Sequence, residues 1–347
     1  MSATHPEIDP TENFGPTSLG GARALVAGLR DLVARNAAGV LAIVVGTSGS
    51  TYRKSGALIL LDAGGVRVGT LSGGCLEAEL EARARDVLAR GIAAEACFDT
   101  SGDEDRVFGS GTGCGGSTQV LLLPLPALSS PLRDALLDAD ARGLGLRLTL
   151  SSAHPGCGAA NVGNECYRFD QRGAPDVDTH EISEPVTLAI APTRRVLLLG
   201  AGPETRPLLA FTRMLGWRVE LVEHRERWLR FADGDAVDRL HRDGPELLVH
   251  LLAATHFDAA LVMNHNVHLD ARCLGHLAAS DVPYVGLLGP PARRDDLLAE
   301  LGAQASERLL QRLHAPVGLS LGGEGAEAIA LAIVAQLQGE FTHHARG

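Results

Sequence analysis

The chain has 347 residues, of which 45 % are hydrophobic and 21 % charged, a composition that provides apolar material for two globular domains. Its net charge of −11 argues against a nucleic-acid partner, because such a partner requires a basic face. Residues 1–18 are polar and lack the apolar segment of a secretory signal, and no apolar run reaches the roughly 20 residues of a membrane span. We therefore expect a cytoplasmic protein that does not contact membranes, with six scattered cysteines present as thiols.

The first part of the chain predicts a mixed α/β domain. Apolar residues at helical spacing predict an amphipathic helix over residues 20–37. Short apolar runs bounded by turn residues then predict strands at residues 40–45, 57–61, 66–71, 94–98 and 119–123. A second periodic helix follows Cys75, and Pro131 begins a third helix that ends near Arg142.

The composition changes after residue 150. Residues 151–192 are rich in Gly, Pro and Asp and contain only short β-like pieces, which favours an irregular β-rich connector. From Arg195, strands alternate with helices, as in a parallel sheet covered on both faces. We therefore predict an α/β protein with four parts: a flexible tail at 1–18, a Gly-rich α/β N-terminal domain at 19–150, the connector at 151–192, and a Rossmann-like parallel-sheet domain at 193–340.

The C-terminal domain begins with the pattern of a dinucleotide-binding turn. The strand at 196–199 is followed by Gly200-Ala201-Gly202 and then by a helix. Gly200 permits the tight turn, and Gly202 lets the backbone approach a pyrophosphate at the helix N-terminus. Glu223 ends the next strand, at the place where an acid binds ribose hydroxyls. The pattern is typical of an NAD(P)-binding fold, and an acid at this place favours the free 2′-hydroxyl of NAD over the 2′-phosphate of NADP.

Three nearby residues keep other interpretations open. Arg225 could accept the 2′-phosphate of NADP. Pro203 removes one N–H from the phosphate cradle, and Thr205 stands where a third small residue is usual. The alternative interpretation is a Rossmann fold whose nucleotide site is vestigial.

Gly-rich loops in the N-terminal domain form a second candidate site. The loop at residues 46–56 carries Ser50, Thr51, Arg53 and Lys54. Backbone donors and two cations suit an anionic ligand. The alternative for Arg53 and Lys54 is a solvated loop.

Two further Gly-rich loops carry cysteines. Cys75 directly precedes a helix, whose dipole lowers the pKa of a thiol and favours the thiolate. Cys114 lies between glycines, where the backbone can be approached closely. The alternative for both is burial as a small hydrophobic residue. The site residues predicted in these loops are Gly73, Gly74, Cys75, Cys114, Gly115 and Gly116.

Several short blocks are typical of one protein family. They are Gly49–Ala57, Gly69–Glu77, Cys114-Gly115-Gly116, Val196–Arg225, Tyr284–Gly289 with Arg293-Arg294, and Leu313–Leu319. In this order the blocks resemble the XdhC/CoxI family over about residues 20–340. Several blocks in the right order are more specific than any one of them.

The resemblance implies a maturation factor rather than an enzyme. It implies that the protein binds and protects molybdenum cofactor and helps a cysteine desulfurase to sulfurate it. The cofactor then passes to xanthine dehydrogenase or a related molybdenum hydroxylase, and the accessory protein forms no part of the mature enzyme. In this interpretation Arg53 and Lys54 hold the cofactor phosphate, and Cys75 or Cys114 contacts the molybdenum or relays sulfur. A homodimer is expected because two-fold pairing is the commonest assembly.

The chain departs from the family pattern in the C-terminal domain. Pro203 stands where the family has His, and Asn266 replaces the usual acid after His265. His265 follows a strand at the carboxyl edge of the sheet, where ligands bind, so we predict it as a cofactor-binding residue. The alternative is an ordinary polar residue at a strand end.

Two other functions are consistent with these patterns. An NAD(P)-dependent oxidoreductase would use the Rossmann-like domain, with His265 as the proton donor beside the nicotinamide. A protein-interaction scaffold would have lost both small-molecule sites.

Overall fold

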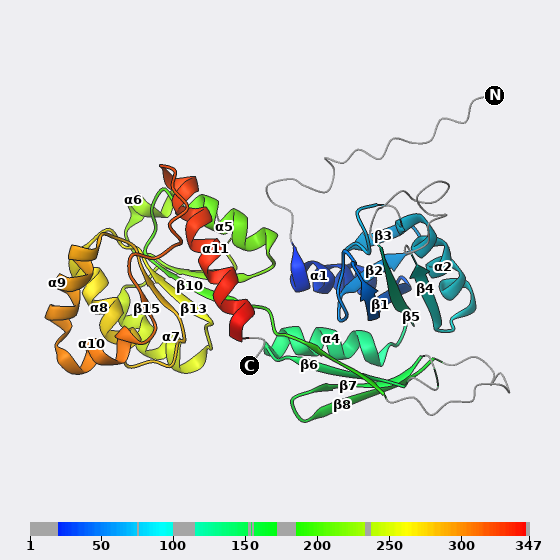
Figure 1. Ribbon diagram of the computed structural model, residues 1–347. Helices are drawn as coiled ribbons and strands as arrows, with labels where there is room; N and C mark the ends of the chain where they lie inside the picture. Colours follow the sequence, from blue (N-terminus) through cyan, green and yellow to red (C-terminus); the bar gives the residue numbers. More distant parts are fainter. Residues whose placement is uncertain are drawn as a thin grey trace. The chain divides into compact units, whose positions relative to one another are not determined.

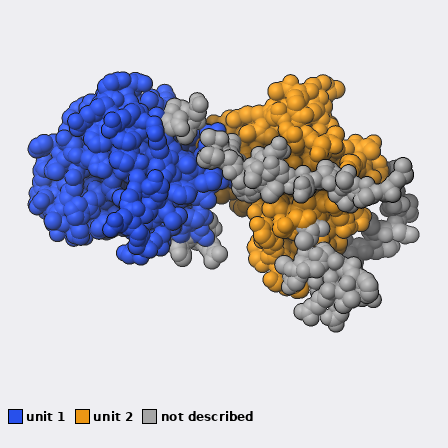
Figure 2. Space-filling view, turned by 90° about the horizontal axis from the view of Figure 1, so that it is seen from above, with its two compact units in different colours: residues 1–21, 194–347 blue, residues 22–193 orange. Residues whose placement is uncertain are grey.

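The computed structural model describes residues 20–74, 76–99, 115–151, 154, 156–171, 185–232 and 237–344. The chain divides into two compact units, residues 22–193 and residues 194–347 with 1–21 (Figure 2). The division after Thr193 lies next to the predicted start of the Rossmann-like domain.

The first unit contains a five-stranded antiparallel sheet with the order β3-β2-β1-β5-β4 (Figure 1). Its strands are β1 (Gly39–Gly49), β2 (Leu58–Asp62), β3 (Gly65–Val68), β4 (Ala94–Asp99) and β5 (Gly116–Leu125). Residues 40–44 of the central strand β1 are all 0 % exposed. Strand β1 is thus buried on both faces, as its continuous apolar run predicts.

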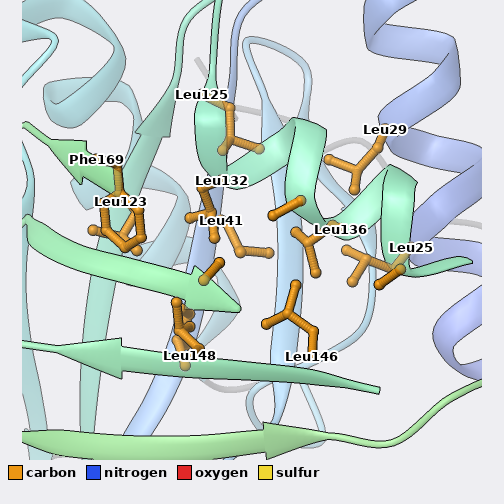
Figure 3. Close-up of a cluster of buried hydrophobic side chains, with 14 of the residues drawn as sticks. Leu25, Leu29, Leu41, Leu123, Leu125, Leu132, Leu136, Leu146, Leu148 and Phe169 are labelled. Carbon is orange, nitrogen blue, oxygen red and sulfur yellow. The ribbon is translucent and has the colours of Figure 1, made fainter. Parts of the chain in front are cut away.

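Helices cover both faces of this sheet. Alternate residues of β1 point to opposite faces. Val40, Ala42 and Val44 share a core with α2 (Glu77–Arg90). Leu41 and Ile43 share the other core with α1 (Gly21–Ala34) and α4 (Pro131–Arg142). Figure 3 shows leucines that meet in this second core, among them Leu25, Leu29, Leu41, Leu132 and Leu136.

The chain after α4 forms a second antiparallel sheet with the order β8-β7-β6-β9. Its strands are β6 (Leu146–Leu150), β7 (Cys157–Val162), β8 (Glu165–Asp170) and β9 (Val186–Ile190). Leu146, Leu148 and Phe169 are buried in the same core as α1 and α4 (Figure 3). The segment predicted as a connector therefore belongs to the first unit, because its alternating strands bury one face in that core.

The second unit contains a six-stranded parallel sheet with the order β12-β11-β10-β13-β14-β15 (Figure 1). Its strands are β10 (Arg195–Leu199), β11 (Arg218–Val222), β12 (Arg239–His241), β13 (Ala259–Val262), β14 (Val285–Leu287) and β15 (Leu313–His314). Strand β10 lies between β11 and β13, so the winding reverses at its carboxyl end. In open α/β sheets this reversal marks the ligand crevice.

Both faces of the parallel sheet are covered by helices. Helices α5 (Thr205–Met214) and α11 (Ala326–His344) pack on one face. The other face is covered by α7 (Leu248–Ala254), α8 (Val267–Ala278), α9 (Pro291–Leu301) and α10 (Ala303–Leu310). This architecture confirms the predicted α/β fold with a Rossmann-like C-terminal domain. Within the described ranges no helix combines the length and apolarity needed to cross a membrane.

Candidate functional site

The Gly-rich loops of the first unit leave the five-stranded sheet at one end. Gly49 at the end of β1 pairs with Gly116 at the start of β5, and Asp99 at the end of β4 pairs with Ser117. Neighbouring strands are antiparallel, so β2 starts and β3 ends at this same end. We call the described residues 49–57, 69–74, 76 and 115–116 the loop end of the sheet. The topology thus brings together the described parts of three loops that the sequence singled out separately.

Two of these loops touch backbone to backbone. A Cβ atom added to Gly116 would lie 2.5 Å from the carbonyl oxygen of Ser50. A Cβ atom on Gly49 would lie 2.5 Å from the carbonyl oxygen of Gly115, and the φ of Gly49 is +68°. Both positions therefore require glycine, Gly49 also for its left-handed conformation. Gly116 has a structural role in strand pairing in addition to its predicted place in the site.

Glu77, at the start of α2, organises the loop that precedes it. Its carboxylate accepts hydrogen bonds from the backbone N–H of Leu71 at 3.1 Å and of Ser72 at 2.9 Å, from the Ser72 hydroxyl at 2.6 Å, and from the Thr70 hydroxyl. The Ser72 hydroxyl in turn accepts from the N–H groups of Gly74 and Leu76. Burial opposes ionisation of Glu77, but the hydrogen bonds from Ser72 and Thr70 prevail and lower its pKa to about 2.

The first loop carries two cations, Arg53 and Lys54. The Thr51 hydroxyl donates to the carbonyl of Arg53 at 2.9 Å, and Lys54 Nζ lies 3.4 Å from the Thr51 oxygen. Arg53 Nε is buried and has no hydrogen-bond acceptor among the described residues. No described carboxylate forms an ion pair with Arg53 or Lys54. An unpaired buried guanidinium nitrogen is costly, and an anionic ligand would satisfy it.

Three glycines at the loop end have no close neighbour among the described residues. Added Cβ atoms on Gly73, Gly74 and Gly115 would meet nothing within 4 Å in the described part of the chain. Only Gly74 has a positive φ, +117°. At Gly73 and Gly115, neither the described neighbours nor the backbone conformation requires glycine.

The predicted metal-contacting residues, Cys75 and Cys114, lie outside the described residues. Their neighbours Gly74, Leu76 and Gly115 are all at the loop end. Among the described residues, no group of three or more His, Cys, Asp or Glu side chains is arranged to hold a metal ion.

In the second unit, Glu223 is withdrawn from solvent. It is 1 % exposed, and Arg225 reaches both of its carboxylate oxygens, at 2.9 and 2.7 Å. The backbone N–H of Ala201 donates to the second oxygen at 3.0 Å. Burial opposes ionisation of Glu223, but the Arg225 side chain outweighs it and lowers the pKa.

His265 lies over the Gly-x-Gly turn. Its Nε2 is 2.9 Å from Oε1 of Glu204, which is 3 % exposed at the start of α5. The imidazole stacks on Trp228 with ring centroids 5.6 Å apart and an interplanar angle of 11°. Sequence reasoning predicted His265 but missed Glu204 and Trp228, because neither matches the dinucleotide pattern.

A buried carboxylate holds the loop that carries His265. Asp270 is 0 % exposed and accepts from the backbone N–H and side-chain amide of Asn264, at 3.2 and 3.0 Å. Arg293, at the start of α9, forms an ion pair with it. Arg225 also donates to the carbonyl of Asn264 at 2.8 Å. One polar network therefore links the carboxyl ends of β10, β11 and β13 to α9.

The same region contains a thiol that we expect to be inert. Cys273 is 2 % exposed, and its burial raises its pKa to about 12. Iodoacetamide at pH 8 is expected to leave Cys273 unmodified in the folded protein, because only the thiolate reacts. Peptide mass spectrometry measures this, with the exposed Cys166 as the matched control. Equal labelling of both cysteines would contradict the expectation.

Comparison with known proteins identifies the family. Sequence models of the XdhC and CoxI family and of the XdhC Rossmann domain match residues 32–99 and 196–337. A probable xanthine dehydrogenase subunit of Bacillus subtilis (strain 168) is 27 % identical over 320 residues, covering 86 % of this chain and 92 % of that protein. A crystal structure described as a xanthine dehydrogenase from Bacillus halodurans has a TM-score of 0.77 and 27 % identity, covering 92 % of this chain and 96 % of that one.

A shorter match is to the uncharacterized protein YqeB of Escherichia coli (strain K12). It is 26 % identical over 145 residues, which cover 41 % of this chain and 26 % of that protein. The two family models together span more than half of the chain. The motif order, the fold and these matches agree, and the chain belongs to the XdhC/CoxI family.

Proposed function

We propose that this chain is an accessory protein for a molybdenum hydroxylase of the xanthine dehydrogenase type. It binds molybdenum cofactor at the loop end and supports the sulfuration and insertion of that cofactor. The relatives named for xanthine dehydrogenase support the client class. The observation that carries the binding site is Arg53, whose Nε is buried without an acceptor among the described residues and which lies at the same end of the sheet as Gly73 and Gly115.

The residues at the loop end fit an anionic pterin cofactor. Arg53 and Lys54 would hold its phosphate, and Gly73 and Gly115 would let it approach the backbone. Glu77 fixes Leu71 and Ser72 in this loop through its hydrogen bonds. When bound, the cofactor supplies the molybdenum centre on which the client hydroxylase depends.

Replacing Arg53 by glutamine is expected to reduce the molybdenum and pterin that copurify with the protein by about tenfold or more, through loss of a charge-assisted contact. The protein is produced in a host that makes the cofactor and purified without oxygen. Molybdenum is measured by mass spectrometry, and released pterin is measured by fluorescence.

The matched control is Arg90→Gln at the far end of α2, where Arg90 forms an exposed pair with Asp86. It removes the same charge and is expected to leave cofactor content unchanged. Equal cofactor content in the two variants would contradict the role of Arg53. Absence of cofactor from the wild-type protein, even after it is supplied, would overturn the proposal itself.

The proposal extends to the partners. We propose that a cysteine desulfurase sulfurates the held cofactor and that the client hydroxylase then accepts it, with the accessory protein acting as a homodimer. Activation of a cofactor-free hydroxylase by the loaded protein, with and without the desulfurase, tests the transfer. Light scattering on the purified protein measures the oligomeric state.

A further inference from the structure

The turn between β10 and α5 has no free N–H group for a phosphate from Gly200 to Pro203. The N–H of Gly200 donates to the carbonyl of Val222 at 2.9 Å. Those of Ala201 and Gly202 donate to Glu223 at 3.0 Å and to the Thr205 hydroxyl at 2.8 Å. Pro203 has no N–H. From Gly200 to Pro203, therefore, no backbone donor of the turn is left for a pyrophosphate.

The space in front of Gly202 is also filled. A Cβ atom added there would lie 2.5 Å from Glu204 Oε1 and closer still to His265 Nε2. The φ of Gly202 is not in the left-handed region, so its backbone conformation does not require glycine. Glycine at this position makes room for the Glu204–His265 pair. The buried Glu204 carboxylate would also repel a pyrophosphate.

His265 is held in this place from several sides. Its φ is +52°, a conformation that is uncommon outside glycine and costs free energy unless the surroundings impose it. Asp270 fixes the preceding Asn264, and Trp228 stacks on the imidazole. The surrounding residues therefore impose the position of His265 at the carboxyl edge of the sheet.

The acid at the end of β11 is likewise occupied. Glu223 would accept ribose hydroxyls in a dinucleotide site. Here it is 1 % exposed, with both oxygens bonded to Arg225 and one to Ala201. The residues of this Rossmann domain therefore do not fit NAD or NADP.

We infer that the glycines of the Gly-x-Gly turn make room for the contact between Glu204 and His265. We also infer that the domain does not bind a dinucleotide in the Rossmann manner. The turn retains its glycines because Gly202 packs under the imidazole and because Gly200, with a φ of +92°, lies against the backbone of Asn264. This inference is independent of cofactor binding at the loop end.

A double-mutant cycle on the full chain tests whether glycine at position 202 makes room for His265. Gly202→Ala is expected to lower the melting temperature by about 5 °C, because the added methyl meets the pair. Asparagine tolerates a positive φ and is shorter than histidine. In the His265→Asn background, Gly202→Ala is therefore expected to lower the melting temperature by less than half as much. An equal cost of Gly202→Ala in both backgrounds would overturn the inference.

Direct titration with NAD⁺, NADH, NADP⁺ and NADPH tests whether the domain binds a dinucleotide. The wild-type protein is expected to bind each with a dissociation constant weaker than about 1 mM. Tighter binding of any of the four that Gly202→Ala abolishes would show that the turn is a working dinucleotide site and overturn the inference. The molybdenum content of the same preparations reports on the loop end separately.

Discussion

Replacing Asp270 by alanine is expected to lower the free energy of unfolding by about 3–5 kcal/mol. Asp270 is 0 % exposed, and its carboxylate pairs with Arg293 and accepts two hydrogen bonds from Asn264. Alanine leaves the Arg293 charge unpaired and two buried donors without an acceptor, which costs more than the original pair contributed. Chemical denaturation followed by circular dichroism measures the loss.

The control for this substitution lies on α9. Asp296 is exposed, and Asp296→Ala is expected to change the free energy of unfolding by less than about 0.5 kcal/mol. Similar effects of the two substitutions would show that the network around His265 does not stabilise the domain.

Replacing Glu77 by glutamine is expected to cost about 2 kcal/mol at pH 7, because an acceptor-only carboxylate is replaced by an amide that can no longer accept all four hydrogen bonds. The cost should depend on pH. The native pKa of about 2 lies below the ordinary value of 4.5. The stabilisation by Glu77 is therefore complete above about pH 4.5 and is lost as the pH falls toward 2.

Denaturation of the wild type and the variant from pH 7 down to pH 2.5 measures this dependence. The difference between them should shrink across that range. Glu79→Gln provides the matched control, because Glu79 lies two residues further along α2 and forms an exposed ion pair with Arg83. A difference between wild type and E77Q that does not change with pH would contradict the role of the carboxylate.

Much of the fold could be predicted from local patterns. The run Val40–Val45 indicated a buried strand, and the alternation after Arg195 indicated the parallel sheet. The segment at 151–192 was harder, because turn-rich stretches interrupt its strands and the apolar face of β6 is recognisable only once α1 and α4 are seen to cover it. Pairing between distant strands is a tertiary property that local periodicity does not encode.

In the candidate sites, too, some features follow from local sequence and others only from the tertiary structure. Arg53 and the glycines of the loop end were predicted as a site because residue type and spacing alone suit an anion, and anion binding there stays a prediction. Glu77 carries a sequence signal, an acid in the first turn of a helix after Ser and Thr, although its bonding to Ser72 emerges only in three dimensions. The Glu204–His265 contact spans 61 positions in sequence, and nothing local predicts it.

The pairing of β1 with β5 has a consequence for exchange of backbone amide protons. Their register runs from Gly39 opposite Leu125 to Gly49 opposite Gly116, with one irregularity between Val44 and Gly46. Amides along such a ladder open only in large cooperative units, so slow exchange should extend to the last residues before the loops. We therefore expect the loop end to be anchored on a slowly exchanging pair of strands, so that faster exchange begins only in the loops beyond Gly49 and before Gly116.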